Sequence, residues 1–169
     1  MIRVRTSRLK RPRASPSAQI APFTWLANPI GYLPLSPPNN CDYDPKNDTL
    51  YACKEGKPRK FYQITDATKP AQRKVSVWEI VDLNTLPAED LSGLHFDPVT
   101  ELLHLVSDDS RRWMTIDQTG KITAQISLDK DDTGADKSIK KAEGVTLGPD
   151  RILYVVGEPN WLFTFKPTE

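Results

Sequence analysis

The sequence is poor in the side chains that most often carry out chemistry. Its 169 residues include only two histidines, His95 and His104, and two cysteines, Cys41 and Cys53. Two imidazoles need at least a third ligand to form a metal site, and the sequence offers no evident one. A disulfide would need the two Cα atoms within about 7 Å, and two free, buried thiols are the simpler prediction. No serine lies in a nucleophile elbow or beside an evident base.

Long apolar runs and a strong excess of charge are also missing. No segment approaches the roughly 20 apolar residues that a membrane-spanning helix needs. Residues 20–35 follow basic residues, as in a signal peptide, but Pro22, Asn28, Pro29 and Pro34 interrupt them. The net charge is only +1, which gives little attraction for phosphate. We therefore expect no transmembrane segment in this chain and no nucleic-acid partner.

The first 38 residues are instead rich in arginine and proline. Six basic residues lie within residues 1–13, and seven prolines lie between residues 12 and 38. Proline removes backbone donors and is disfavoured in helices and central strands. This composition predicts a disordered leader over residues 1–38. A basic arm that binds phosphate is the alternative, and nothing later in the sequence supports it.

From residue 39 the sequence is that of a β protein with an internal repeat. Three turn dipeptides mark the repeat: Asp44-Pro45, Asp97-Pro98 and Gly148-Pro149. Each one separates two apolar runs, and the prolines are 53 and 51 residues apart. Proline fixes φ for the second position of a turn, and aspartate bonds its own downstream backbone. A period near 50 residues, built from short strands, is typical of four-stranded propeller blades.

The apolar runs predict eleven strands. These are Cys41–Asp44, Leu50–Cys53, Lys60–Ile64, Val75–Val81, Leu91–Phe96, Leu102–Val106, Arg112–Asp117, Lys121–Leu128, Glu143–Leu147, Ile152–Val156 and Trp161–Phe165. We predict an all-β fold, a partial propeller of two and a half to three four-stranded antiparallel blades over residues 39–169. The blades would span about 39–83, 84–130 and 140–169, the last with three strands. Closed propellers usually have four to eight blades, so open blade edges would promote self-association.

Three blocks carry a resemblance to a known family: DYDPKNDTLYACKEGKPRKFYQI, LSGLHFDPVTELLHLVSDDSRR and AEGVTLGPDRILYVVGEPNWLFTF. Over roughly residues 41–166 the chain resembles the SdiA-regulated (YjiK-like) bacterial family. The resemblance implies the C-terminal part of a five-bladed propeller related to NHL repeats. It also implies a plasma-membrane or periplasmic location behind an N-terminal anchor, a calcium site, and no established enzymatic activity.

The chain departs from the family pattern in three ways. The anchor and the first two blades are absent, Asn39-Asn40 stands where an acidic residue and glycine are expected, and Gly157 replaces a serine. These departures suggest a chain truncated at its N-terminus, whose first 38 residues have another origin. Such a product, without a clear signal peptide, would remain in the cytoplasm.

Four acidic residues are candidate calcium ligands: Glu143, Glu158, Asp108 and Asp109. Acids at the ends of inner and second strands tend to gather at the mouth of a propeller channel. A calcium ion takes six to eight oxygen ligands, which carboxylates from several blades would supply. The alternative for each acid is a solvated turn residue.

Glu143 is the strongest of these candidates. It precedes Gly144, and the corresponding pairs in the other repeats are Ser92-Gly93 and Asn39-Asn40. Blade packing therefore does not require an acid at this position. We expect Glu143 to bind a hard cation with help from Glu158 and Asp108.

A second acidic stretch, Asp129–Gly134, is similar to the start of an EF-hand loop. Its twelfth position is Lys140, where the loop requires glutamate. We therefore interpret it as a flexible acidic loop between blades.

Two classes of function remain open at this point. The favoured one is a binding or scaffold propeller of the cell envelope, stabilised by calcium and without turnover, with an unknown ligand or protein partner. The alternative is an esterase-like or lactonase-like hydrolase that uses a metal held by channel carboxylates. The resemblance of fold alone is a weak argument for chemistry.

Overall fold

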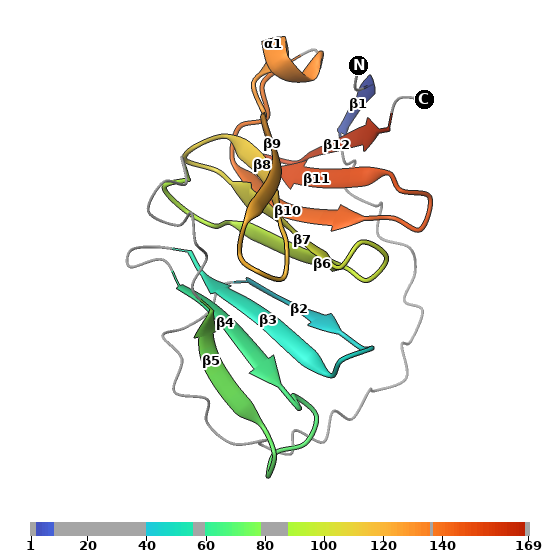
Figure 1. Ribbon diagram of the computed structural model, residues 1–169. Coiled ribbons are helices and arrows are strands. Elements are labelled where there is room, and N and C mark those ends of the chain that lie inside the picture. Colours follow the sequence, from blue (N-terminus) through green and yellow to red (C-terminus); the bar gives the residue numbers. More distant parts are fainter. Residues whose placement is uncertain (1–2, 9–39, 56–59, 79–87, 136, 168–169) are drawn as a thin grey trace, which may run out of the picture.

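Three antiparallel sheets of four strands each make up the protein. The computed structural model describes residues 3–8, 40–55, 60–78, 88–135 and 137–167. In chain order the sheets form blades one, two and three, and Figure 1 shows them stacked face to face. The all-β prediction and the partial propeller are confirmed.

Blades one and two each use four consecutive strands in the order predicted. Blade one contains β2 (Asn40–Asp44), β3 (Thr49–Lys54), β4 (Lys60–Thr65) and β5 (Lys74–Trp78). Blade two contains β6 (Gly93–Asp97), β7 (Leu102–Ser107), β8 (Arg112–Ile116) and β9 (Ile122–Ser127). Every predicted bound lies within two residues of the observed one, except the end of Val75–Val81, which lies outside the described residues.

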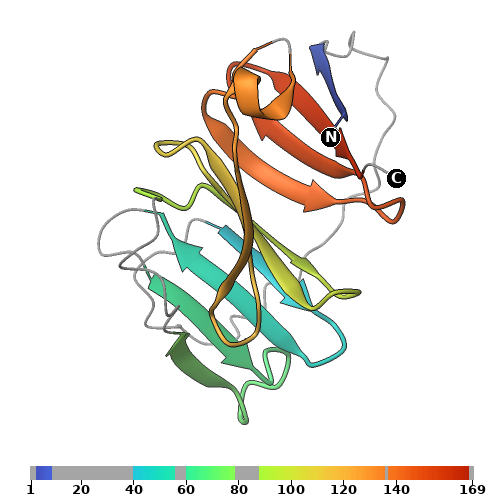
Figure 2. The same ribbon diagram turned by 45° about the horizontal axis from the view of Figure 1, so that its top comes forward.

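Blade three has four strands, which corrects the prediction of three. It contains β10 (Ala142–Leu147), β11 (Leu153–Gly157), β12 (Trp161–Lys166) and, from the start of the chain, β1 (Arg3–Arg8). Strand β1 runs antiparallel to β12 from Arg3 opposite Lys166 to Arg8 opposite Trp161, and Figure 2 shows the two side by side. The prediction of disorder is therefore wrong for residues 3–8; residues 9–38 lie outside the described part.

The physical reason lies in the edge of β12. Without β1, this strand would expose a row of unpaired N–H and C=O groups, which readily accept another strand. Val4 and Thr6 are β-branched and alternate with basic residues, a pattern compatible with a strand. The high content of arginine and proline predicted disorder in spite of this pattern.

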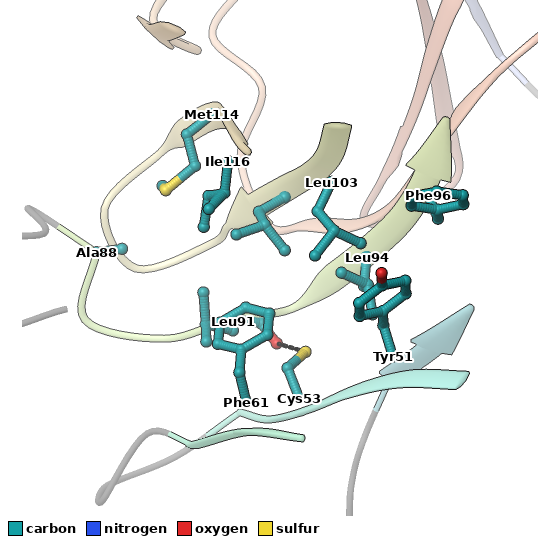
Figure 3. Packing of buried hydrophobic residues seen from close by; sticks show 11 residues of the cluster. Tyr51, Cys53, Phe61, Ala88, Leu91, Leu94, Phe96, Leu103, Met114 and Ile116 are labelled. Carbon is teal, nitrogen blue, oxygen red and sulfur yellow. Dashed lines mark hydrogen bonds between the residues drawn. The ribbon is translucent and has the colours of Figure 1, made fainter. Parts of the chain in front are cut away.

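Apolar side chains fill the spaces between neighbouring blades. Between blades one and two the buried cluster contains Tyr51, Cys53, Phe61, Ala88, Leu91, Leu94, Phe96, Leu103, Leu105, Met114 and Ile116, and Figure 3 shows this packing. The rings of Tyr51 and Phe96 stack with their centroids 5.3 Å apart. A second cluster, centred on Val106, Val155 and Phe163, fills the space between blades two and three. Each fully buried side chain of this kind contributes roughly 1.5–3 kcal/mol.

The inner strands of blades two and three approach closely at two glycines. A Cβ atom on Gly93 would lie 2.6 Å from Val106 Cγ2 and 3.0 Å from the Cα of Gly144. Such distances leave no room for a side chain, so glycine is required where β6 and β10 meet. Ser92, just before this point, donates from Oγ to the backbone oxygen of Ala142 at 2.6 Å.

Polar links join the first turns of successive blades. Lys46 Nζ lies 2.8 Å from Glu101 Oε1, and Arg151 donates from both terminal nitrogens to the carboxylate of Asp97 at 2.8 Å. Burial alone would raise the pKa of Asp97. The bonds from Arg151 and from its own turn outweigh that effect and hold the pKa well below its usual range. The Asp-Pro turns therefore also lock neighbouring blades together.

Candidate functional site

Acids from all three blades influence one another at one end of the inner strands. Glu55, Asp108 and Glu158 each follow the second strand of a blade, and Glu143 lies in β10. We call these four residues the acidic rim. Burial first, and then the charges of Asp108 and Glu158, raise the pKa of the Glu143 carboxyl. The charge of Glu55 acts in the same direction, so three of the four predicted ligands interact, together with one acid that the prediction had not included.

Lys141 supplies positive charge to the acidic rim. Its Nζ lies 2.8 Å from Glu158 Oε2, and its backbone N–H donates to the carboxylate of Asp108. The bond to Glu158 and then its charge raise the pKa of the lysine, and Asp108 and Glu143 add to this. The lysine thus connects an acid of blade two with an acid of blade three.

Asp90 is the residue that orients Asp108, and sequence reasoning missed it. Its buried carboxylate accepts bonds from Ser107 Oγ at 2.5 Å and from the N–H groups of Asp108 and Asp109 at 3.1 and 3.0 Å. Burial, followed by the charges of Asp90 and Asp109, raises the pKa of Asp108. The repeat gave no signal for Asp90, because Pro37 and Lys141 occupy the equivalent positions.

The acidic rim has the donor atoms and the charge that calcium prefers, but its carboxylates are too far apart to hold the ion in this arrangement. Carboxylate oxygens are the ligands that this ion prefers. Within the described ranges, however, no three Asp, Glu, His or Cys side chains come together closely enough to hold a metal ion. Asp109 is exposed, and its carboxylate acts on the site through its charge beside Asp108.

The two histidines lie opposite each other on β6 and β7. His95 Nδ1 is 2.8 Å from Asp42 Oδ2, which also accepts a bond from the N–H of Phe96 at 2.8 Å. His104 is buried, and among the described residues neither of its ring nitrogens has a hydrogen-bond partner. Burial and then the nearby His95 lower the pKa of His104 to about 4. It is therefore a neutral packing residue at neutral pH.

The two cysteines are free thiols, as predicted, but only one is buried. Cys53 is buried, and burial raises the pKa of its thiol to about 12. Cys41 is exposed, which corrects the prediction for it. Cys53 lies opposite Asn40, the neighbour of Cys41, so the two thiols point to opposite faces of the sheet.

The acidic stretch after blade two contains a helical turn that the prediction of a loop did not include. Residues Lys130–Thr133 form α1, a single helical turn that ends at Gly134 with φ of 66°. Asp129, just before it, pairs with Arg111 Nη1 at 2.9 Å. The structure therefore adds a helical turn to the predicted loop between blades, and the flexibility of the stretch stays a prediction. Across the described part of the chain, no helix is long and apolar enough to cross a bilayer.

Comparison with known proteins agrees with this architecture. The solved structure of Kuenenia stuttgartiensis hydrazine synthase matches 80% of this chain with a TM-score of 0.51 and 14% sequence identity. The match covers 33% of that chain, so the present chain spans about a third of its length. At this identity the likeness supports the propeller-like fold alone. The family model of SdiA-regulated proteins matches residues 40–166, which contain β2 to β12. The chain therefore belongs to the SdiA-regulated family.

Proposed function

We propose that this chain is a non-enzymatic binding or scaffold propeller domain of the bacterial cell envelope, and that calcium binds at its acidic rim. The observation that carries the proposal is that acids of three blades act on Glu143: burial raises its pKa most, and repulsion from Asp108, Glu158 and Glu55 raises it further. A divalent cation relieves such repulsion and draws the blades together. Turnover is not required for that role.

Glu143 is the proposed central ligand, with Glu158 and Asp108 beside it. Within the part of the chain that the structure describes, no three acids are close enough to hold the ion directly, so binding requires the exposed side chains of Glu143 and Glu158 to turn inward. Lys141 competes with the ion, because it already pairs with Glu158 at 2.8 Å. Calcium binding therefore breaks or lengthens this pair.

A thermal melt with calcium and with chelator tests the proposal. We expect calcium to raise the melting temperature of the wild-type chain. Glu143→Gln keeps the volume and removes the charge, so it abolishes this shift and leaves the chelator-treated melt unchanged or slightly higher. Lys141→Gln removes the competing cation and enlarges the shift.

Asp131→Asn serves as the matched control, since Asp131 lies on α1 and is not part of the acidic rim. It should keep the full calcium shift. A shift of the same size in Glu143→Gln would leave Glu143 as an ordinary strand residue and would overturn the site. Absence of any calcium effect on the wild-type chain would overturn the calcium proposal as a whole.

The cell-envelope location and the five-bladed ring rest on the family resemblance, and they remain proposals. The hydrolase alternative needs several side chains around one metal and an open water position. No observation in the described residues favours it.

A further inference from the structure

The three blades present equivalent faces along the chain. We call the side of a blade that is turned toward the next blade its forward face, and the opposite side its rear face. Strand register assigns three matching positions to each forward face. They are Asn40, Cys53 and Phe61 in blade one, Gly93, Val106 and Trp113 in blade two, and Gly144, Val156 and Leu162 in blade three.

The forward face of blade three is open, whereas its equivalents are covered. Val156 is 40% exposed, while Cys53 and Val106 at the equivalent positions are 0% exposed. A hollow of about 420 Å³ lies on this face, and its lining is mostly apolar. The residues around it are Gly144, Val145, Thr146, Tyr154, Val156 and Leu162. In blades one and two the corresponding space receives side chains of the following blade.

The rear face of blade one is exposed along its first and last strands. Tyr43, Val75 and Val77 are 38%, 40% and 55% exposed, and register places all three on this face. Five large apolar side chains are exposed within the described residues, and these three and Val156 are four of them. The fifth, Val99, lies in a turn. Exposed apolar surface is thus concentrated on the two end faces of the stack, which points to an interaction there.

We propose that the forward face of blade three binds the rear face of blade one of a second copy of this chain, head to tail. The internal contact between blades one and two serves as the template. There, Phe96 of the incoming inner strand β6 stacks on Tyr51 at 5.3 Å. Tyr43 occupies the position of Phe96, and Tyr154 occupies the position of Tyr51, so the second copy places an aromatic ring where the template has one.

The inner strand β2 is the part of blade one that docks. Within the chain, the inner strand of each incoming blade contacts the first two strands of the preceding blade. On β2 both Cys41 and Tyr43 are exposed, whereas Ala52, Tyr62 and Ile64 further out on the same face are already buried. The exposed strand β2 and the hollow over β10 and β11 are therefore the two complementary halves. The interface is heterologous, because different surfaces of the two copies meet.

Light scattering during gel filtration of the full chain, over a range of concentrations, tests the contact. We expect the wild-type chain to associate at concentrations up to about 100 μM, as interfaces of micromolar affinity do. Val156→Lys and Tyr43→Lys each place a charge in one half of the interface and weaken association by about tenfold or more. Val99→Lys is the control, since Val99 is 77% exposed in the turn between β6 and β7 and lies on neither face.

A mixture of the two interface variants distinguishes this geometry from others. The Tyr43→Lys copy keeps an intact forward face, and the Val156→Lys copy keeps an intact β2, so an equimolar mixture recovers association. Far-UV circular dichroism checks that each variant is folded. Wild-type dimers or longer head-to-tail series both support the contact. A wild-type chain that stays monomeric overturns it, as does unchanged association of Tyr43→Lys or a mixture that stays monomeric.

Discussion

Single buried polar residues in this protein are of two kinds, partnered and unpartnered. Asp97 is buried with Arg151, Thr100 and the N–H of Val99 as partners, and its carboxylate stays charged. His104 is buried beside Trp113 and His95, with ring centroids 5.5 and 6.1 Å away. Among the described residues its nitrogens have no hydrogen-bond partner. A partnered group stabilises the fold, whereas an unpartnered one costs about 1–3 kcal/mol.

The unpartnered histidine gives a pH-dependent prediction. The unfolded pKa of histidine is near 6.5, and that of folded His104 is about 4. Between these values the unfolded chain binds more protons than the folded chain does. The free energy of unfolding therefore decreases as pH falls from about 6.5 to 4. The loss is at most about 3.5 kcal/mol, since one pKa unit corresponds to about 1.4 kcal/mol. His104→Phe should be within about 1 kcal/mol of wild type at pH 7 and should remove this loss.

Urea unfolding at several pH values measures the effect. His95→Gln is the control, because it removes the other imidazole and keeps His104 in place. This control should retain most of the loss on the acidic side. A His104→Phe variant whose stability falls as steeply as that of wild type would show that other groups cause the acid sensitivity.

The sequence indicated some site residues and not others, for a physical reason. Asp108 and Glu158 recur after the second strands of their blades, so the periodicity itself identifies them. Glu55 occupies the same place in the first repeat, so that signal was present although the predicted ligand set omitted it. Glu143 was identified by contrast, because the equivalent positions in the other repeats hold Ser92 and Asn39. Asp90 acts through bonds to residues 17 to 19 positions further along the chain, and Lys141 acts through a contact between blades two and three. No local pattern reports such contacts.

At the level of elements, the strands follow from local chemistry. Alternating apolar residues with Asp-Pro and Gly-Pro turns predict the bounds of β2 to β12 within two residues, apart from the end of β5. Strand β1 was missed because its partner, β12, lies at the opposite end of the chain, and pairing across such a separation leaves no local signal. The family match likewise begins at residue 40 and does not include β1.

The close approach of β6 and β10 gives a prediction at this scale. Gly93→Ala would place a Cβ atom 2.6 Å from Val106 Cγ2 and 3.0 Å from the backbone of Gly144. Because the backbone cannot yield as a flexible side chain does, the two blades must separate. We expect a loss of about 1–3 kcal/mol, measured by urea unfolding at neutral pH.

Gly134→Ala provides the comparison for that substitution. Gly134 has φ of 66° and open space where a Cβ would lie, so the substitution costs only about 1–2 kcal/mol of local backbone strain. Hydrogen exchange separates the two effects. Gly93→Ala should increase exchange in both β6 and β10, whereas Gly134→Ala should affect α1 alone. Unchanged exchange in β10 of Gly93→Ala would mean that the glycine is not needed for blade contact.

For the whole molecule, a nearly neutral net charge conceals an uneven distribution. The chain carries a charge of +1, yet acids of three blades meet at the acidic rim, and Lys141 is the cation that lowers the pKa of both Asp108 and Glu143. Burial first, and then the charges of neighbouring acids, raise the pKa of Asp108 and of Glu143, so both effects destabilise the folded chain once these groups ionise. Packing between blades and the ion pairs of Lys46 with Glu101 and of Arg151 with Asp97 therefore hold the stack together against this cost.

This repulsion predicts how stability depends on salt in the absence of calcium. The screening length falls from about 10 Å at 0.1 M salt to about 3 Å at 1 M, so added sodium chloride weakens the repulsion and raises the melting temperature in chelator. Glu143→Gln removes the central charge and should melt slightly higher than wild type at low salt, with a difference of under about 0.5 kcal/mol because the side chain is exposed. The difference should disappear at high salt, while Asp131→Asn should follow wild type at every salt concentration. A Glu143→Gln chain that melts lower than wild type at low salt would show that the carboxylate stabilises the apo protein and that the acids of the rim do not repel one another.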